Sequence, residues 1–256
     1  MRMKHAALLA PIFAALALAG CGKANNGQLQ GWVEAETVFV SPDEQGRVEV
    51  LKVRQGDKVE RGDLLFTLDD DLQKADVAVK QATVSSARQA FNRAEELLRS
   101  ASGTQKALDD ASANLRQAEA NLEWSKTRLA RRRALSPAAG SIQEVYFRPG
   151  ETVPMGRPVA ALLPPSNLKI RFYAPETKLA AIKIGETVTV SCDACSAGLT
   201  AKVTFIAQSA EFTPPVIYSM EERAKLVFLI EARPDNPEKF RVGQPVSVTL
   251  RDETAK

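Results

Sequence analysis

Two cysteines in the C-terminal part of the chain have a spacing that could support chemistry. Cys192 and Cys195 form a C-x-x-C pair, which is typical of a thiol–disulfide redox centre, half of a zinc site or a structural disulfide. A redox pair of this type sits at a helix N-terminus, whereas Gly198 and a strand-like segment follow here. Tetrahedral zinc needs two further ligands, and the sequence has no second pair. A disulfide in a hairpin loop and a redox pair are the interpretations that stay open.

The N-terminal segment indicates export. Arg2 and Lys4 precede an apolar stretch, residues 6–19, that is too short for a permanent transmembrane helix and has the proportions of a signal peptide. It ends in Leu-Ala-Gly-Cys21, which resembles the lipobox of bacterial lipoproteins. We therefore expect residues 1–20 to be removed and Cys21 to be the lipidated first residue of a periplasmic protein, held at the inner rather than the outer membrane.

Export has two consequences for the chemistry. The only histidine, His5, is removed with the signal peptide. A mature chain without histidine excludes Ser/His and Cys/His catalysis and every His-ligated metal site. The oxidising compartment favours a disulfide between Cys192 and Cys195 over a redox role. We therefore expect no catalytic, cofactor-binding or metal-binding residue. We also expect no nucleic-acid partner, because the net charge is only +3.

Two segments of the sequence repeat one glycine spacing. In each copy the glycines lie ten and then six residues apart, and the copies start 94 residues apart. The glycines are Gly46, Gly56 and Gly62 in the first copy and Gly140, Gly150 and Gly156 in the second. Each copy is typical of a strand, a tight turn in which glycine supplies a positive φ, and a second strand. Two such halves must pack together to bury a face, so we expect one small β-sandwich with an insertion.

The insertion predicts an antiparallel helical hairpin. Residues 72–99 and 104–133 contain neither Gly nor Pro, and the break at 100–103 is followed by Thr104 as a plausible N-cap. In the second arm, small and apolar residues recur at steps of three and four, which indicates a heptad seam. This seam comprises Leu108, Ala111, Leu115, Ala118, Leu122, Ser125 and Leu129. A weaker seam is expected in the first arm from Ala75, Val79, Ala82, Ser86, Ala90 and Leu97. Arg131, Arg132 and Arg133 are interpreted as cations in the last helical turn, where they interact favourably with the helix dipole.

The remainder of the chain alternates polar and apolar residues with the period of β-strands. A short helix is expected at residues 175–182, between a proline and Gly185. Five strands and one helix indicate a small β-barrel. The expected strands are Leu168–Ala174, Thr187–Cys192, Thr200–Ala207, Lys225–Ala232 and Val246–Arg251.

Together, the paired glycine motifs, the helical insertion and the terminal strands resemble the HlyD-type membrane fusion proteins, the periplasmic adaptor subunits of export systems. The resemblance implies an elongated α+β fold, in which a split lipoyl-like β-sandwich is interrupted by an antiparallel α-helical hairpin and followed by a small β-barrel. The predicted boundaries are 1–20 for the signal peptide, 21–30 for a linker, 31–71 for the first lipoyl-like half with its N-terminal strand, 72–133 for the hairpin, 134–165 for the second half, 166–252 for the barrel and 253–256 for a tail.

The resemblance also implies partners. In adaptors that dock on TolC-type outer-membrane channels, the hairpin tip carries a spacing matched by Arg93, Leu97, Thr104 and Asp109, with Thr in place of Ser. The simpler interpretation is that these are ordinary helix residues and an N-cap. Residues 212–228 resemble a stretch in adaptors of ABC-type exporters, so the expected inner-membrane partner is an ABC-type transporter. Members of the family act as rings, commonly hexamers, and no cofactor is implied.

Two other functions fit parts of the sequence. A lipoprotein without a transport role could use the hairpin as a coiled-coil scaffold in an envelope complex. A lipoyl carrier would need a modifiable lysine in the turn between the two half-motifs, but the insertion replaces that turn and residues 69–71 are all aspartate. We expect an adaptor that links a transporter to a channel and catalyses nothing.

Overall fold

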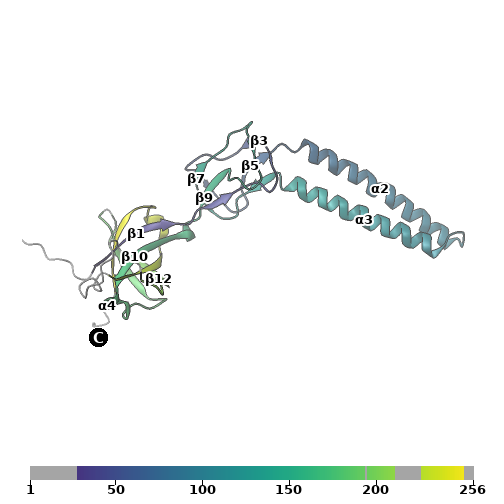
Figure 1. Ribbon diagram of the computed structural model, residues 1–256. Coiled ribbons are helices and arrows are strands. Elements are labelled where there is room, and N and C mark those ends of the chain that lie inside the picture. Colours follow the sequence, from purple (N-terminus) through teal and green to yellow (C-terminus); the bar gives the residue numbers. More distant parts are fainter. Residues whose placement is uncertain (1–27, 194, 211–225, 251–256) are drawn as a thin grey trace, which may run out of the picture. The chain divides into compact units, whose positions relative to one another are not determined.

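The computed structural model describes residues 28–193, 195–210 and 226–250 (Figure 1). The chain divides into two compact units, one spanning Ala35–Leu168 and one formed by the residues before and after it. The predicted signal peptide, Cys21, most of the stretch 212–228 and the tail lie outside the described residues. Among the described helices, none is both long and apolar enough to span a bilayer.

The first unit, formed by the residues before Ala35 and after Leu168, is a closed six-stranded barrel. Its strand order is β1-β10-β13-β12-β11-β14. Its strands are β1 (Gln28–Ala35), β10 (Leu168–Pro175), β11 (Thr187–Ser191), β12 (Leu199–Ile206), β13 (Val227–Pro234) and β14 (Pro245–Thr249). Its short helices are α4 (Glu176–Leu179) and η4 (Pro237–Lys239), and η2 (Pro165–Asn167) lies at the end of the other unit. Every second residue of β10 is buried, as in a strand with one face on a core. The five strands expected after residue 165 are confirmed, with ends that differ by a few residues.

The barrel takes its sixth strand from a segment that the sequence placed elsewhere. Residues 21–30 were expected to be a linker and residues from 31 onward part of the lipoyl-like half. Instead, β1 pairs with β14 in the register Gln28↔Thr249 to Trp32↔Pro245, with Leu29 and Val33 buried in the barrel. A side chain at Gly31 would collide with the backbone of β10. The expectation was wrong because the partner strand lies more than two hundred residues away, beyond the reach of local periodicity.

The second unit contains a sandwich of two four-stranded sheets, β2-β9-β7-β4 and β6-β5-β3-β8. The strands are β2 (Val38–Val40), β3 (Gly46–Leu51), β4 (Lys58–Val59), β5 (Leu64–Leu68), β6 (Arg133–Leu135), β7 (Gly140–Val145), β8 (Thr152–Val153) and β9 (Ala160–Leu163). Each copy of the glycine motif lends its short middle strand to the other copy: β4 pairs with β7, and β8 pairs with β3. The two halves therefore interlock and cannot fold as separate sheets.

Equivalent residues of the two copies meet in the sandwich core. Val48, Val59, Leu65 and Leu68 are buried, and so are the residues 94 positions later, namely Ile142, Val153, Val159 and Leu162. Gly56, Gly62, Gly150 and Gly156 lie in turns with φ between 75° and 94°, as their spacing predicts. Gly46 and Gly140 are not turn residues. Each begins a strand, and a side chain there would strike Arg132 or the carbonyl of Leu163, respectively. These two glycines are needed for close approach and not for a positive φ.

The insertion forms the helices α2 (Asp71–Arg99) and α3 (Gln105–Ala130), which lie side by side (Figure 1). The expected seam of α3 is confirmed, since Leu115, Ala118, Leu122 and Ser125 are buried. The expected seam of α2 is wrong. The residues of α2 that pack against α3 are Val77, Val84, Ala87 and Phe91, whereas Ala75, Val79, Ala82, Ser86 and Leu97 are exposed and Ala90 is half-buried. Alanine occurs on every side of this arm, so only the bulky Val84 and Phe91 mark its inner face.

The arginine triplet also differs from its expected position. Because α3 ends at Ala130 and β6 begins at Arg133, Arg131 is the C-cap and the next two arginines lie beyond the helix. Arg132 is buried, at 8% exposure. Burial of a guanidinium requires specific partners, so an interaction with the helix dipole alone does not explain this residue.

Candidate docking site on the helical hairpin

The tip of the hairpin is a short, tightly closed loop. The carbonyl of Leu97 accepts hydrogen bonds from the backbone N–H of Ser102 at 2.8 Å and from the hydroxyl of Ser100 at 3.1 Å. Ala101 has a φ of 56°, and a Cβ at Gly103 would lie 2.9–3.0 Å from the backbone of residues 97 and 98. The loop therefore folds back on the end of α2, and the last carbonyl groups of that helix accept hydrogen bonds from the loop.

The four predicted tip residues all lie on the two helices that flank this loop. Arg93 and Leu97 are one helical turn apart on α2, so they share a face, and both are exposed. Leu97 exposes 51% of its surface. A cation beside an exposed leucine can form a charged hydrogen bond and an apolar contact with the same partner surface.

Thr104 and Asp109 already take part in bonds within the hairpin. The Thr104 hydroxyl accepts a hydrogen bond from the N–H of Ala107 at 3.2 Å and thereby caps α3. Asp109 accepts from the side-chain amide of Gln105 at 2.8 Å. The capping role agrees with the simpler interpretation of Thr104. It leaves docking possible, because an accepting hydroxyl can still donate its own hydrogen.

An exposed apolar stripe runs along α2, formed mostly by residues that were expected to face α3. Leu72, Val79 and Leu97 expose 81%, 61% and 51% of their surface. Exposed small residues (Ala75, Ala82 and Ser86) lie between them at helical spacing. This exposed row is a candidate contact surface for another protein. The signal for it was present in the weak α2 seam, which was read as an internal contact.

The cysteine pair lies on the barrel. Cys192 and Cys195 are joined by a disulfide between β11 and β12. The amide of Gln244, in the turn before β14, donates to the Sγ atom of Cys192 at 2.9 Å. The disulfide therefore packs against a neighbouring turn of the same barrel and has the environment of a structural cross-link.

The described residues offer little that could bind a metal or a small molecule. Within them, no three Cys, His, Asp or Glu side chains gather as metal ligands would. A recess of about 440 Å³ lies beside the turns of the first glycine motif. Its two carboxylates, Asp57 and Asp63, already accept backbone hydrogen bonds from Arg54 and Glu60 at 2.8 and 2.7 Å.

Comparison with known proteins agrees with this assessment. Residues 36–164, nearly the whole second unit, match a family model described as RND MFP, barrel-sandwich hybrid domain. The chain is 27% identical to a UPF0194 membrane protein in the asrC 5′ region of Acidithiobacillus ferridurans, over 87% of this chain and 86% of the relative.

Solved structures show the same fold. The membrane fusion protein Spr0693 of Streptococcus pneumoniae R6 superimposes with a TM-score of 0.69 at 19% identity, over 88% of this chain and 99% of the other. A MacA–MexA chimera with the Pseudomonas aeruginosa MexA α-hairpin superimposes with a TM-score of 0.69 at 20% identity, over 88% and 80% of the two chains. The resemblance drawn from the glycine motifs and the hairpin is confirmed at the level of the family. The chain belongs to the membrane fusion proteins, the periplasmic, membrane-associated adaptors of efflux systems, which link other proteins and are not enzymes.

Proposed function

We propose that this chain links an inner-membrane transporter to a TolC-type outer-membrane channel and that the hairpin tip makes the contact with the channel. The observation that carries the proposal is the tip itself, where the exposed Arg93 and Leu97 share one face of α2. The helices have 29 and 26 residues, so at 1.5 Å per residue the hairpin extends by roughly 40 Å. This is a reach suited to bridging between proteins in the envelope.

Thr104 and Asp109 complete the proposed docking surface. In this proposal, Arg93 provides a fixed positive charge with several donors, Leu97 provides the apolar contact, and the Thr104 hydroxyl donates to a channel carbonyl. Asp109 stands on the next turn of α3, where its bond to Gln105 stiffens the start of that helix. The surface thus combines one apolar centre with polar groups around it, as protein interfaces commonly do.

The rest of the proposed assembly concerns anchoring and copy number. We propose that the lipidated Cys21 tethers the chain to the inner membrane and that several copies form a ring, hexameric as in the adaptors it resembles. The α2 stripe supports the ring, because exposed leucine and valine side chains on a helix become buried when a second hairpin packs beside them. The role is mechanical, sealing and coupling a conduit for a substrate.

For the inner-membrane partner we propose an ABC-type transporter, on the basis of the resemblance in residues 212–228. The description of the matching family model carries the letters RND, and a partner of that class is the competing outcome of the same experiment. Crosslinking in membranes, purification of the chain and identification of the captured proteins decide between them. Capture of a transporter together with an outer-membrane channel is expected, and capture of neither would leave the envelope scaffold as the function.

Export measurements test the tip directly. Arg93→Asp and Leu97→Asp should abolish export while the folded chain accumulates at its normal level. Arg116→Asp is the matched control, since Arg116 is an exposed arginine of α3 that lies more than two turns from the loop. Unchanged export in both tip variants would remove the docking proposal.

A further inference from the structure

The hairpin joins the sandwich through two short connections. Residues 69–70 link β5 to α2, and residues 131–132 link α3 to β6. Both connections are held by backbone hydrogen bonds, from the N–H of Leu68 to the carbonyl of Arg132 at 2.8 Å and from the N–H of Asp69 to the carbonyl of Arg47 at 2.9 Å. Two connections define an axis, and two points of attachment alone leave a body free to swing about that axis.

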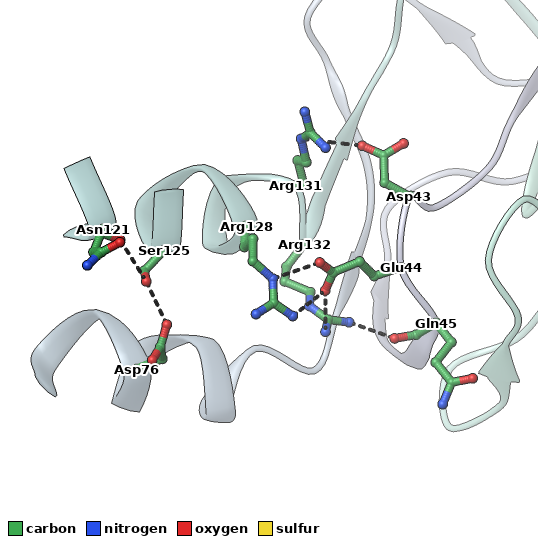
Figure 2. Close-up of polar contacts among 9 residues, drawn as sticks. All are labelled: Asp43, Glu44, Gln45, Asp76, Asn121, Ser125, Arg128, Arg131 and Arg132. Carbon is green, nitrogen blue, oxygen red and sulfur yellow. Dashed lines mark hydrogen bonds and ion pairs between the residues drawn. The ribbon is translucent and has the colours of Figure 1, made fainter. Parts of the chain in front are cut away.

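A third contact comes from the loop between β2 and β3. Figure 2 shows Glu44 of this loop facing the last turn of α3. Arg128 donates to both carboxylate oxygens of Glu44, from Nε at 2.7 Å and from Nη2 at 3.0 Å. Arg132 donates to the carbonyl of Gln45 at 2.9 Å and to Glu44 at 3.3 Å. We call these four residues (Glu44, Gln45, Arg128 and Arg132) the root clasp.

The surroundings of the root clasp are adapted to it. Arg132 occupies the space that a side chain at Gly46 would need, since a Cβ there would lie 2.6 Å from its Nη1 atom. The guanidinium of Arg128 lies 4.8 Å from the centre of the Trp124 indole ring, so one face of the cation is covered by the ring. Arg131 adds a longer ion pair with Asp43 at 3.5 Å. The absence of a side chain at Gly46 thus leaves room for Arg132.

The root clasp fixes the orientation of its side chains, but it can open. A bidentate arginine–carboxylate pair fixes the direction of both side chains. The Arg128 and Glu44 side chains are nevertheless 36% and 35% exposed, so water and salt can reach the pair. Such a contact can open without exposing the sandwich core, because the core residues lie between the two sheets.

We propose that the root clasp sets the direction of the hairpin relative to the sandwich and that opening it lets the hairpin swing on its two connections. The clasp is a conformational device in a part of the molecule distant from the docking tip. It would let one adaptor hold its tip in a defined direction and still yield when its partners move. The proposal concerns the isolated chain and does not depend on which channel or transporter it binds.

The test measures distances between spin labels in the full mature chain with Cys21→Ser. One label is placed at the tip by Ser102→Cys and one on the sandwich by Arg157→Cys, both at exposed positions. The native cysteines are paired in the disulfide and do not react. The parent chain should give one narrow distance distribution, and Glu44→Gln should broaden it at least twofold. Glu60→Gln, at an exposed residue of the turn after β4 and outside the clasp, should leave the width unchanged.

The dependence on salt concentration is a second measurement, made first on the parent chain. Raising the salt concentration to about 1 M shortens the screening length to roughly 3 Å, so the parent distribution should broaden while that of Glu44→Gln changes little. Circular dichroism establishes that both helices persist. A distribution that stays equally narrow in Glu44→Gln and in high salt would overturn the proposal. If Glu44→Gln fails to fold, the salt response of the parent chain alone decides.

Discussion

The two helices of the hairpin use their apolar residues in opposite ways. In α3, Leu115, Ala118 and Leu122 are buried against its partner helix. In α2, only Val84 is buried to the same degree, and the large side chains of Leu72, Val79 and Leu97 point to solvent. The seam of α3 therefore serves the contact between the helices, while α2 divides its apolar residues between that contact and an exposed face.

The largest effect on stability is expected from the α3 seam. Leu122→Ala removes a side chain that is 5% exposed and leaves a cavity in the buried cluster between the two helices. The hairpin should lose about 2–4 kcal/mol of stability, visible as a lower melting temperature of the helical circular dichroism signal. Val79→Ala on the outer face of α2 is the matched control and should cost less than about 0.5 kcal/mol. Equal losses in the two variants would contradict the division of roles between the arms.

The next largest effect concerns the one polar residue in the seam. Ser125 is 1% exposed, and its hydroxyl donates to a carboxylate oxygen of Asp76 on α2 at 2.6 Å (Figure 2). Ser125→Ala leaves that half-buried carboxylate without this hydrogen bond, so we expect a loss of about 1–2 kcal/mol. Denaturant unfolding measures it. The double variant Ser125→Ala with Asp76→Ala should lose less stability than the sum of the losses in the two single variants, because both substitutions remove the same hydrogen bond.

A smaller effect is expected at the start of α3. Thr104→Ala removes the cap on the N–H of Ala107 and should cost about 1 kcal/mol, whereas Thr104→Ser should keep the cap. Hydrogen exchange of the first turn of α3 reports it. Export separates the two roles of this residue: normal export by Thr104→Ser together with poor export by a well-folded Thr104→Val would support donation to a channel.

The smallest effect concerns the pH dependence of the root clasp. The hydrogen bond from Arg128 lowers the pKa of Glu44 below its ordinary value of 4.5. A lowered carboxyl pKa contributes stability that is complete above the ordinary pKa and is lost as the pH falls through the folded-state pKa. Since Glu44 is about one third exposed, the contribution is roughly 0.5–1 kcal/mol. The difference in unfolding free energy between the parent and Glu44→Gln should be constant above pH 5 and shrink below pH 4.5. A difference that grows on acidification would contradict this pairing.

The contrast between the arms also explains what the sequence can predict. Leucine recurs at every second position of the α3 seam, so the inner face of that helix is readable from spacing alone. Alanine and serine surround α2, and its inner face is set by where Val84 and Phe91 meet α3. The sandwich was predictable because its two halves repeat the same glycine spacing. The sixth barrel strand and the pairing of Glu44 with Arg128 were not, because each joins residues at least 84 positions apart.

The most direct test of the account compares two leucines on the same exposed stripe of α2. A photo-crosslinking amino acid replaces Leu97 near the tip or Leu72 at the start of the helix, and crosslinking is carried out in intact cells. The account predicts an adduct with an outer-membrane channel from position 97 and none from position 72. Absence of a channel adduct from position 97, in cells where the protein is folded and export is active, would contradict docking through the hairpin tip.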